Sequence, residues 1–250
     1  MSLDLSKIGV VVLAAGKGTR LNCTDKPKVM LEIGGRPIVS YVVETLKKVG
    51  FKKEQICLVV GFKKELAQDY FKDTVVYADQ TEQKGTAHAT YVGIKSLPNN
   101  IEQVLVLGGD DSAFYQPETL ENLISQHIEN NCVLTLLSAN EEDTGGAGRI
   151  IKTEKGIEII EKEYLTEDQK KINEISTGTF VFDRGWFERI FPDMPLLRKL
   201  GEYGLPTALA IAREANEKFQ VIKLADANEW RGINTKEELE EANKRKLENK

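Results

Sequence analysis

A glycine-rich loop after the first apolar run carries the strongest chemical signal in the sequence. The run extends from Ile8 to Gly16 and overlaps LAAGKGTRL, residues 13–21. Gly16 and Gly18 allow the backbone to approach a ligand and to turn amide groups toward an anion. The loop is not a dinucleotide fingerprint, because residue 21 is leucine, and the GK[ST] ending of a P-loop occurs nowhere in the chain. It predicts either another kind of phosphate site or a tight exit from a strand.

The charges around this loop favour the phosphate site. Lys17, Arg20, Lys26 and Lys28 are accompanied by a single acidic residue, Asp25, in a chain whose net charge is −5. Arginine offers a rigid fork of donors and lysine a point charge, and enzymes use both to bind polyphosphates and to stabilise charge during phosphoryl transfer. We therefore expect a triphosphate at this loop.

A pair of carboxylates forms the second candidate site. The segment LVLGGDD predicts a buried strand that ends in two glycines and then presents Asp110 and Asp111. Mg²⁺ favours one or two protein oxygens together with phosphate oxygens and water, so a carboxylate at this position suits a magnesium ion that accompanies a triphosphate. A simple turn between strand and helix is the alternative. The basic glycine loop, which is expected at the same edge of the sheet, favours the metal.

Alternating strands and helices would position both sites. The apolar run predicts a buried parallel strand, and a helical pattern follows from Pro37 to Gly50. The alternation repeats with strands near 55–61, 75–78 and 103–109 and helices near 63–71, 86–96 and 117–130. This order predicts a parallel α/β sheet with helices on both faces, which binds ligands at the carboxyl edge of its strands.

The second half of the chain has shorter strands and more charged connections, which indicates that the sheet becomes mixed. Strands are expected at 133–138 and from Ser176, and a hairpin at 145–161 turns around Lys155 and Gly156. Residues 161–173 are typical of a charged loop or short helix. Helices are expected at 205–215 and 235–250, the second opened by a capping box of Thr235 and Glu238.

Composition excludes several classes of function. Of the 250 residues, 41% are hydrophobic and 29% charged, which is typical of a globular protein. The 34 basic and 39 acidic residues argue against nucleic-acid binding. No apolar run is long enough for a membrane span or has the basic flank of a secretion signal, so a cytoplasmic protein is expected. Three separated cysteines predict reduced thiols, and His88 and His127 are assigned to helix faces without a chemical role.

The glycine loop resembles the signature of the sugar-1-phosphate nucleotidyltransferase family. The family's LAAGxGTR motif stands at residues 13–20 and is followed by Pro27 and Lys28. The similarity covers nearly the whole chain and is greatest to the uridylyltransferase domains of bacterial enzymes that make UDP-N-acetylglucosamine. The further matching stretches are ADQTEQKGTAHA from Ala78, LGGD ending at Asp110, GAGRI from Gly146, IIEKE around Glu161, ISTG around Thr177 and RGIN ending at Asn234.

This resemblance implies a Rossmann-like, GT-A-like nucleotidyltransferase fold of the α/β class, with a mostly parallel mixed central sheet flanked by helices. It further implies one domain over residues 1–250. Residues 1–140 would form the nucleotide-binding half, and residues 141–250 would form the sugar-binding half and the C-terminal helix.

The resemblance also implies roles for individual residues. Arg20 and Lys28 would bind the triphosphate as catalytic groups, and Asp110 and Asn234 would hold Mg²⁺ as cofactor. The Gln80 amide, which offers both a donor and an acceptor, would lie beside the base, and Thr86 would either cap the following helix or reach the ligand. The whole implied nucleotide set is Leu13, Ala14, Ala15, Gly16, Gly18, Thr19, Gln80, Gly85, Thr86 and Gly109, and the implied sugar set is Gly148, Glu161, Ser176 and Thr177.

The implied reaction is transfer of a nucleotidyl group from a nucleoside triphosphate, UTP in the first place, to a sugar-1-phosphate, N-acetylglucosamine-1-phosphate in the first place. A phosphate monoester is already ionised near pH 7, so no histidine base is required. Small-molecule substrates are the expected partners, with no nucleic acid and no membrane, and the oligomeric state is open. Acetyl transfer is not expected, because no hexapeptide-repeat region precedes the end at Lys250.

Two departures from the subfamily bear on the acceptor. Ser176 stands where the subfamily has asparagine, and DSAFY follows Asp110, so Asp111 could join or crowd the metal site. Two alternatives therefore stay open. One is a nucleotidyltransferase for another hexose-1-phosphate or for phosphocholine, and the other is a non-catalytic regulatory subunit that binds a nucleotide sugar.

Overall fold

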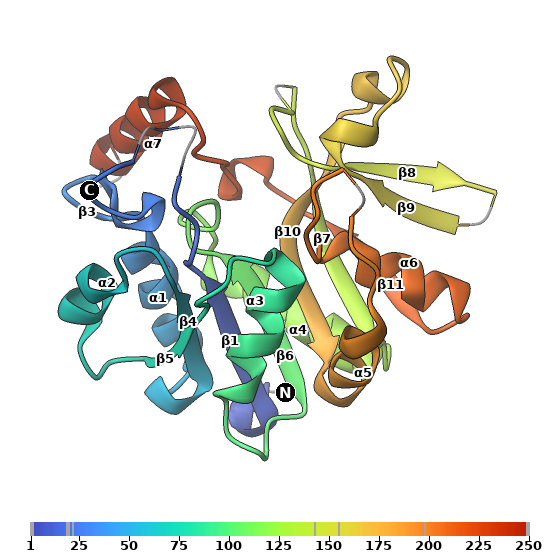
Figure 1. The fold of residues 1–250 in the computed structure, drawn as a ribbon, viewed down its shortest axis with the longest axis horizontal. Helices are drawn as coiled ribbons and strands as arrows, with labels where there is room; N and C mark the ends of the chain where they lie inside the picture. Colours follow the sequence, from blue (N-terminus) through green and yellow to red (C-terminus); the bar gives the residue numbers. More distant parts are fainter. Residues whose placement is uncertain are drawn as a thin grey trace.

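A mixed β-sheet runs through the molecule and carries helices on both faces (Figure 1). The computed structural model describes residues 3–18, 21, 23–142, 144–154, 156–197 and 199–248. Within these residues the sheet has the order β11-β7-β10-β6-β1-β4-β5, with β8 paired to β10 and β9 paired to β8. Its strands are β1 (Ile8–Leu13), β4 (Ile56–Val60), β5 (Val76–Asp79), β6 (Gln103–Gly108), β7 (Leu134–Asn140), β8 (Arg149–Thr153), β9 (Gly156–Ile160), β10 (Glu174–Asp183) and β11 (Phe219–Lys223).

The strands of the first half are parallel, as the alternation of strands and helices predicts. β1 pairs with β4 on one side and with β6 on the other, and β4 pairs with β5, all in parallel. Parallel neighbours need a crossover, and the helices supply it. β10 then inserts between β6 and β7 and is antiparallel to both. The predicted α/β fold, with a mostly parallel mixed sheet, is therefore confirmed.

Successive residues of β1 pack into two different apolar cores, because neighbouring side chains of a strand point to opposite faces. Val10 and Val12 belong to the core under α1, α2 and α4. Val11 belongs to the core under α3, α5 and α6. The helices of the described residues are α1 (Ile38–Val49), α2 (Lys64–Phe71), α3 (Thr86–Lys95), α4 (Pro117–Glu129), α5 (Arg184–Ile190), α6 (Pro206–Glu214) and α7 (Lys236–Glu248).

Most predicted elements lie within a few residues of their observed bounds, and the exceptions are short. The hairpin of β8 and β9 is confirmed, although Lys155 at its tip lies outside the described residues. Pro37 caps α1 rather than forming its first residue. Sequence reasoning missed α5, β11 and the small hairpin of β2 (Glu32–Ile33) and β3 (Arg36–Pro37), because segments of two to seven residues show little periodicity.

The C-terminal helix α7 returns to the first half of the chain and packs on β2 (Figure 1). Its predicted capping box is present: the Thr235 amide donates to Glu238 (2.8 Å), and the Glu238 amide donates to the Thr235 hydroxyl (3.2 Å). Near the other end, Lys246 Nζ donates to the Ala113 carbonyl at 2.7 Å. In the part of the chain that the structure describes, no helix is both long and apolar enough to cross a membrane.

His127 makes the stability of the fold depend on pH. Its side chain is buried on α4, where Nε2 donates to Gln103 Oε1 (2.9 Å) and Nδ1 accepts from the Thr135 hydroxyl (2.8 Å). Burial lowers the pKa of His127 from its ordinary 6.5 to about 4. As the pH falls below 6.5, His127 therefore becomes protonated in the unfolded chain but stays neutral in the folded chain. The free energy of unfolding decreases progressively down to about pH 4.

We expect this group alone to reduce the free energy of unfolding by about 2 kcal/mol between pH 7 and pH 5. Urea unfolding at both pH values measures the difference for the wild type and for His127→Asn. The variant should be less sensitive to pH by about that amount. An equal pH sensitivity in both proteins would show that the buried imidazole is not responsible.

Candidate active site

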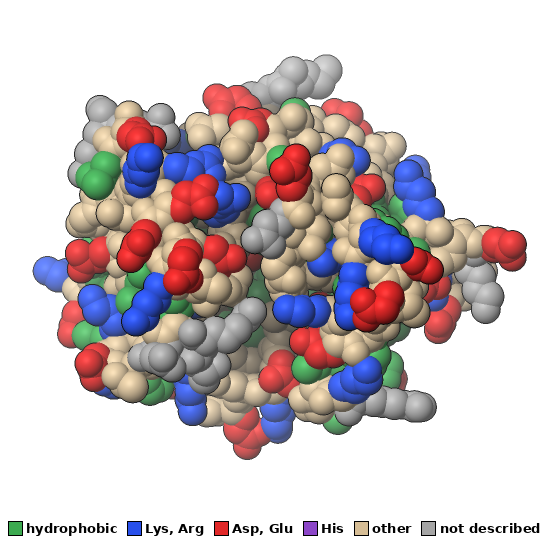
Figure 2. Space-filling model, turned by 90° about the horizontal axis from the view of Figure 1, so that it is seen from above, with side chains coloured by type: hydrophobic (Ala, Val, Ile, Leu, Met, Phe, Trp, Pro, Cys, Tyr) green, Lys and Arg blue, Asp and Glu red, His purple; other side chains and the backbone are tan. Residues whose placement is uncertain are grey.

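A pocket of about 540 Å³ opens at the carboxyl edge of the sheet, where the sequence placed both candidate sites. Figure 2 looks down on this edge and shows the surface hollowed near its middle. The walls come from the ends of β1 and β6, the bend in β10, the loop between β7 and β8, and the segment before α7. The predicted site residues that line it are Leu13, Thr86, Asp110, Gly148, Glu161, Ser176, Thr177 and Asn234.

The start of the glycine loop lies beside this pocket. The Gly109 amide donates to the Leu13 carbonyl at 2.9 Å, so the ends of β1 and β6 are joined. Gly18 has a φ of +70°, and a Cβ there would lie 2.7 Å from Lys28 Cβ, which explains the glycine. Gly16 is exposed. The two remaining predicted residues of the loop, Thr19 and Arg20, lie outside the described residues.

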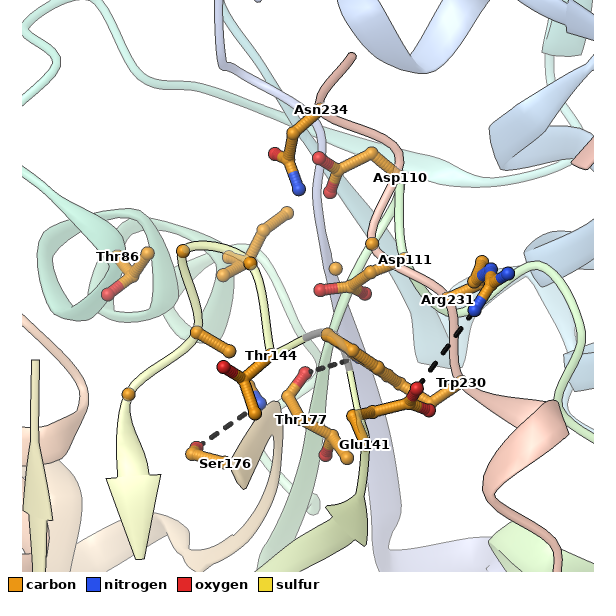
Figure 3. A pocket seen from close by; sticks show the side chains of 18 of the residues that line it. Thr86, Asp110, Asp111, Glu141, Thr144, Ser176, Thr177, Trp230, Arg231 and Asn234 are labelled. Carbon is orange, nitrogen blue, oxygen red and sulfur yellow. Dashed lines mark hydrogen bonds and ion pairs between the residues drawn. The ribbon is translucent and has the colours of Figure 1, made fainter. Parts of the chain in front are cut away.

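Lys28, Asp110 and Asn234 meet at the mouth of the pocket. Lys28 Nζ donates to Asn234 Oδ1 at 2.9 Å and forms an ion pair with the Asp110 carboxylate. The Lys28 side chain is only 12% exposed, so this ammonium is largely withdrawn from water. In Figure 3 the Asp110 and Asn234 side chains face each other. Three groups that are far apart in the sequence thus converge, two of them on the positive charge of the third.

The oxygens of Asp110 and Asn234 suit a magnesium ion. Both already surround a cation, and one carboxylate with one amide oxygen is a donor set that Mg²⁺ accepts when phosphates and water complete its coordination. Among the described residues, no three His, Cys, Asp or Glu side chains cluster as metal ligands. A metal bound here would take further oxygens from bound phosphates and from water.

Asp111, whose role the sequence left open, lies directly below this cluster (Figure 3). Its carboxylate accepts from the Ser112 hydroxyl at 2.8 Å and lies where a side chain at Gly108 would clash. Burial, and next the charge of Asp110, raise the pKa of Asp111 above its ordinary value. The backbone carbonyl of Asp111 accepts from the Arg231 amide at 3.1 Å, which ties the segment before α7 to the end of β6.

Gln80 and Gly85 lie beside the glycine loop. A Cβ at Gly61 would touch both Ala15 and the Gln80 backbone carbonyl, so these three residues are neighbours. The side chain of Gln83, which sequence reasoning missed, donates to the Ala15 carbonyl at 2.6 Å. Ala14 is tied back to β4 through the Val59 carbonyl at 2.9 Å. The predicted nucleotide residues that the structure describes thus lie close together next to the pocket, although most of them do not line it.

Thr86 does not cap α3, contrary to one of the two roles considered for it. It is the first residue of the helix, Gly85 is the N-cap, and the Thr86 hydroxyl accepts from the Leu205 amide at 3.0 Å. The Gly85 backbone (φ +100°) lies so close to Tyr203 that a side chain would clash. This contact draws the loop before α6 onto the predicted nucleotide surface.

The predicted sugar residues converge on the opposite wall. The Ser176 amide donates to the Gly148 carbonyl at 2.8 Å, and a Cβ at Gly148 would lie 3.3 Å from the Glu161 carboxylate. The register of β10 shifts between Ser176 and Phe180, and Gly178 there adopts a φ of +76°. Such a bulge redirects a strand locally, and here it brings residues 176–178 to the pocket. Burial raises the pKa of the Glu161 carboxyl.

The backbone of Thr177, and not its hydroxyl, makes the contact with the neighbouring pocket residue Trp230. The hydroxyl donates to the Leu137 carbonyl at 2.7 Å inside the sheet, whereas the Thr177 carbonyl accepts from Trp230 Nε1 at 2.9 Å. Trp230 and Arg231 line the pocket and were not predicted, although they lie at or next to the RGIN stretch. Arg231 forms ion pairs with Glu141 (4.0 Å) and with Glu241 on α7, which joins the loop after β7 to the C-terminal helix (Figure 3).

A sheet edge that combines a glycine loop with a lysine, a carboxylate and an amide oxygen has the features expected of a nucleotidyltransferase. The comparisons with known proteins agree. The chain belongs to the family of MobA-like NTP transferase domains, which its residues 10–219 match.

Curated relatives of the chain are similar over nearly all of its length. It is 35% identical over 236 residues to the bifunctional protein GlmU of Streptococcus mutans and 36% identical over 246 residues to that of Symbiobacterium thermophilum. The matches cover 94% and 96% of this chain and 50% and 51% of the relatives. The chain thus spans about half the length of the curated relatives it matches.

A solved structure shares the fold. It is the crystal structure of a Bacillus anthracis protein assigned as a glucose-1-phosphate thymidylyltransferase, in complex with a sucrose. The TM-score is 0.77, with 96% of this chain and 95% of that chain covered at 18% identity. This likeness confirms the expected nucleotidyltransferase fold.

Proposed function

We propose that the chain transfers a uridylyl group from UTP to N-acetylglucosamine-1-phosphate, with Mg²⁺, and releases pyrophosphate. The observation that carries the proposal is the convergence of Lys28, Asp110 and Asn234 at the mouth of a pocket between the nucleotide residues and the sugar residues. The motif resemblance to uridylyltransferase domains of enzymes that make UDP-N-acetylglucosamine supports both substrates, and the chain is similar to GlmU over most of its length. The uracil would lie beside Gln80 and the sugar beside Glu161 and Gly148.

In this reaction an oxygen of the acceptor phosphate attacks the α-phosphorus in line. A phosphorus–oxygen bond to the acceptor forms as the bond to pyrophosphate breaks, and no covalent enzyme intermediate is needed. When bound at Asp110 and Asn234, Mg²⁺ would neutralise the phosphate oxygens. The protein positions the two substrates and supplies a donor and an acceptor: Lys28 turns from Asp110 to donate to the triphosphate, and Glu161 accepts from sugar hydroxyls.

The test is pyrophosphate release with each of the four ribonucleoside triphosphates against a panel of sugar-1-phosphates and phosphocholine, with and without Mg²⁺. The expected result is Mg²⁺-dependent release that is fastest with UTP and N-acetylglucosamine-1-phosphate. Release with no pair, together with binding of a UDP-sugar by calorimetry, would instead support a regulatory subunit.

One observation favours a second acceptor as the alternative. The Ser176 hydroxyl accepts from the Gly178 amide within the bulge (3.3 Å), so it is turned back on its own strand. The asparagine of the subfamily would instead offer a longer amide. Fastest release with a different hexose-1-phosphate would therefore assign the choice of sugar to Ser176 and to the segment after Asp110.

A further inference from the structure

The Gln80 side chain, at the carboxyl end of β5, has both of its donor hydrogens occupied. Gln80 Nε2 lies 3.1 Å from the Gly85 carbonyl oxygen and 3.0 Å from His88 Nδ1. The residue is only 5% exposed, so these contacts are shielded from water. An amide nitrogen carries two hydrogens, and here each has an acceptor. Within the described residues, the amide oxygen has no partner.

The Gly85 carbonyl shows which way the amide faces. A carbonyl oxygen can only accept, so the NH₂ group and not the oxygen of Gln80 must face Gly85. The same carbonyl also accepts from the Ala89 amide at 3.1 Å, which fixes it as part of the first turn of α3. His88, one turn further along, must then present an unprotonated Nδ1 to the second hydrogen.

The surroundings of His88 favour this acceptor role. Partial burial, and next the charge of Lys84, lower the pKa of His88, which favours the neutral imidazole. Its ring centroid lies 6.3 Å from that of Phe191, which itself stacks on Tyr91 at 4.4 Å. The imidazole thus contacts both the Phe191 ring and the Gln80 amide.

We propose that His88 is a positioning residue that accepts the second N–H of the Gln80 amide. With both N–H groups occupied, this amide can offer a nucleobase only its oxygen, a hydrogen-bond acceptor. Uracil and thymine carry an N3–H that donates to such an oxygen, whereas cytosine presents an unprotonated N3 that repels it. The proposal deepens the proposed function, because it takes the base to lie beside Gln80. It assigns a specificity role to a histidine that the sequence placed on a helix face without one.

The experiment compares His88→Leu with His88→Asn. Leucine removes the His88 acceptor, so that only the Gly85 carbonyl still holds the amide and the Gln80 side chain can rotate to present an N–H to cytosine N3. Asparagine keeps an oxygen close to the position of Nδ1. Calorimetric affinities for UTP, dTTP and CTP with Mg²⁺, and kcat/KM where turnover occurs, give the ratio of UTP to CTP. We expect leucine to lower this ratio roughly tenfold, the effect of one hydrogen bond, and asparagine to restore most of it.

A purely structural role would weaken UTP and CTP equally, and an unchanged ratio in His88→Leu would overturn the proposal. His127→Asn is the matched control, because it alters a buried histidine away from the pocket and should leave the ratio unchanged. The calorimetric affinities separate the hypothesis about the reaction from the hypothesis about His88. Suppose that the wild-type protein turns over no sugar-1-phosphate but binds UTP more tightly than CTP, and that His88→Leu lacks this preference. The proposed reaction would then fail, while the role of His88 would stand.

Discussion

Replacing Lys28 with alanine is expected to lower kcat/KM for the triphosphate by about 10²-fold or more, the scale for removing a donor that stabilises transition-state charge. Lys28 is the described cation that contacts both Asp110 and Asn234, and its side chain is 12% exposed. In water such a charge would be screened, whereas in this partly buried position its interaction with phosphate oxygens would be stronger. Pyrophosphate release under saturating acceptor measures the effect.

Lys26→Ala is the matched control, since Lys26 carries the same charge in the same loop. Its side chain is 44% exposed, and its ion pair with Glu32 is long at 3.9 Å. Removing it should change kcat/KM less than threefold, because exposed ion pairs contribute little. A Lys28→Ala enzyme that remains folded and within tenfold of the wild-type rate would remove Lys28 from the catalytic groups. The resemblance predicts a loss of similar size for Arg20→Ala.

Asp110→Asn is expected to reduce turnover on the order of 10²-fold or more and to raise the Mg²⁺ concentration needed for half-maximal rate. The substitution keeps the shape of the side chain but removes the negative charge that would hold the metal, whose contribution in such sites is worth several kcal/mol. The Lys28 ammonium would also lose its ion pair. Titration of the rate with Mg²⁺ separates loss of metal affinity from loss of turnover.

Two further carboxylates, Asp79 and Asp111, provide comparison variants for the Mg²⁺ titration. Asp79 ends β5 at the same edge of the sheet but pairs with Lys64 and is 40% exposed, so Asp79→Asn should leave the Mg²⁺ dependence unchanged. Asp111→Asn tests the question that the sequence left open. A rise in the Mg²⁺ requirement equal to that of Asp110→Asn would place Asp111 in the metal site, and normal turnover in Asp110→Asn would contradict the assignment of the metal to Asp110.

The local pattern of the chain predicted most of the fold. The apolar run at 8–13, the strand that leads to Asp110 and the capping box at Thr235 are all visible in the sequence, because burial and capping depend on residues close together. The short elements α5 and β11 were not predicted, since seven and five residues provide too little periodicity. The role of Thr86 was also open until its contact with Leu205 was known.

The sequence by itself determined the class of the protein: the glycine loop, its basic residues and the carboxylates after a buried strand are local features with direct chemical meaning. Only the tertiary structure decided how they meet. Lys28 and Asn234 are separated by 206 positions, and α7, beyond the sugar residues in the chain, packs beside the first half. Long-range pairing depends on which surfaces exclude water together, a property of the packed whole that no local pattern contains.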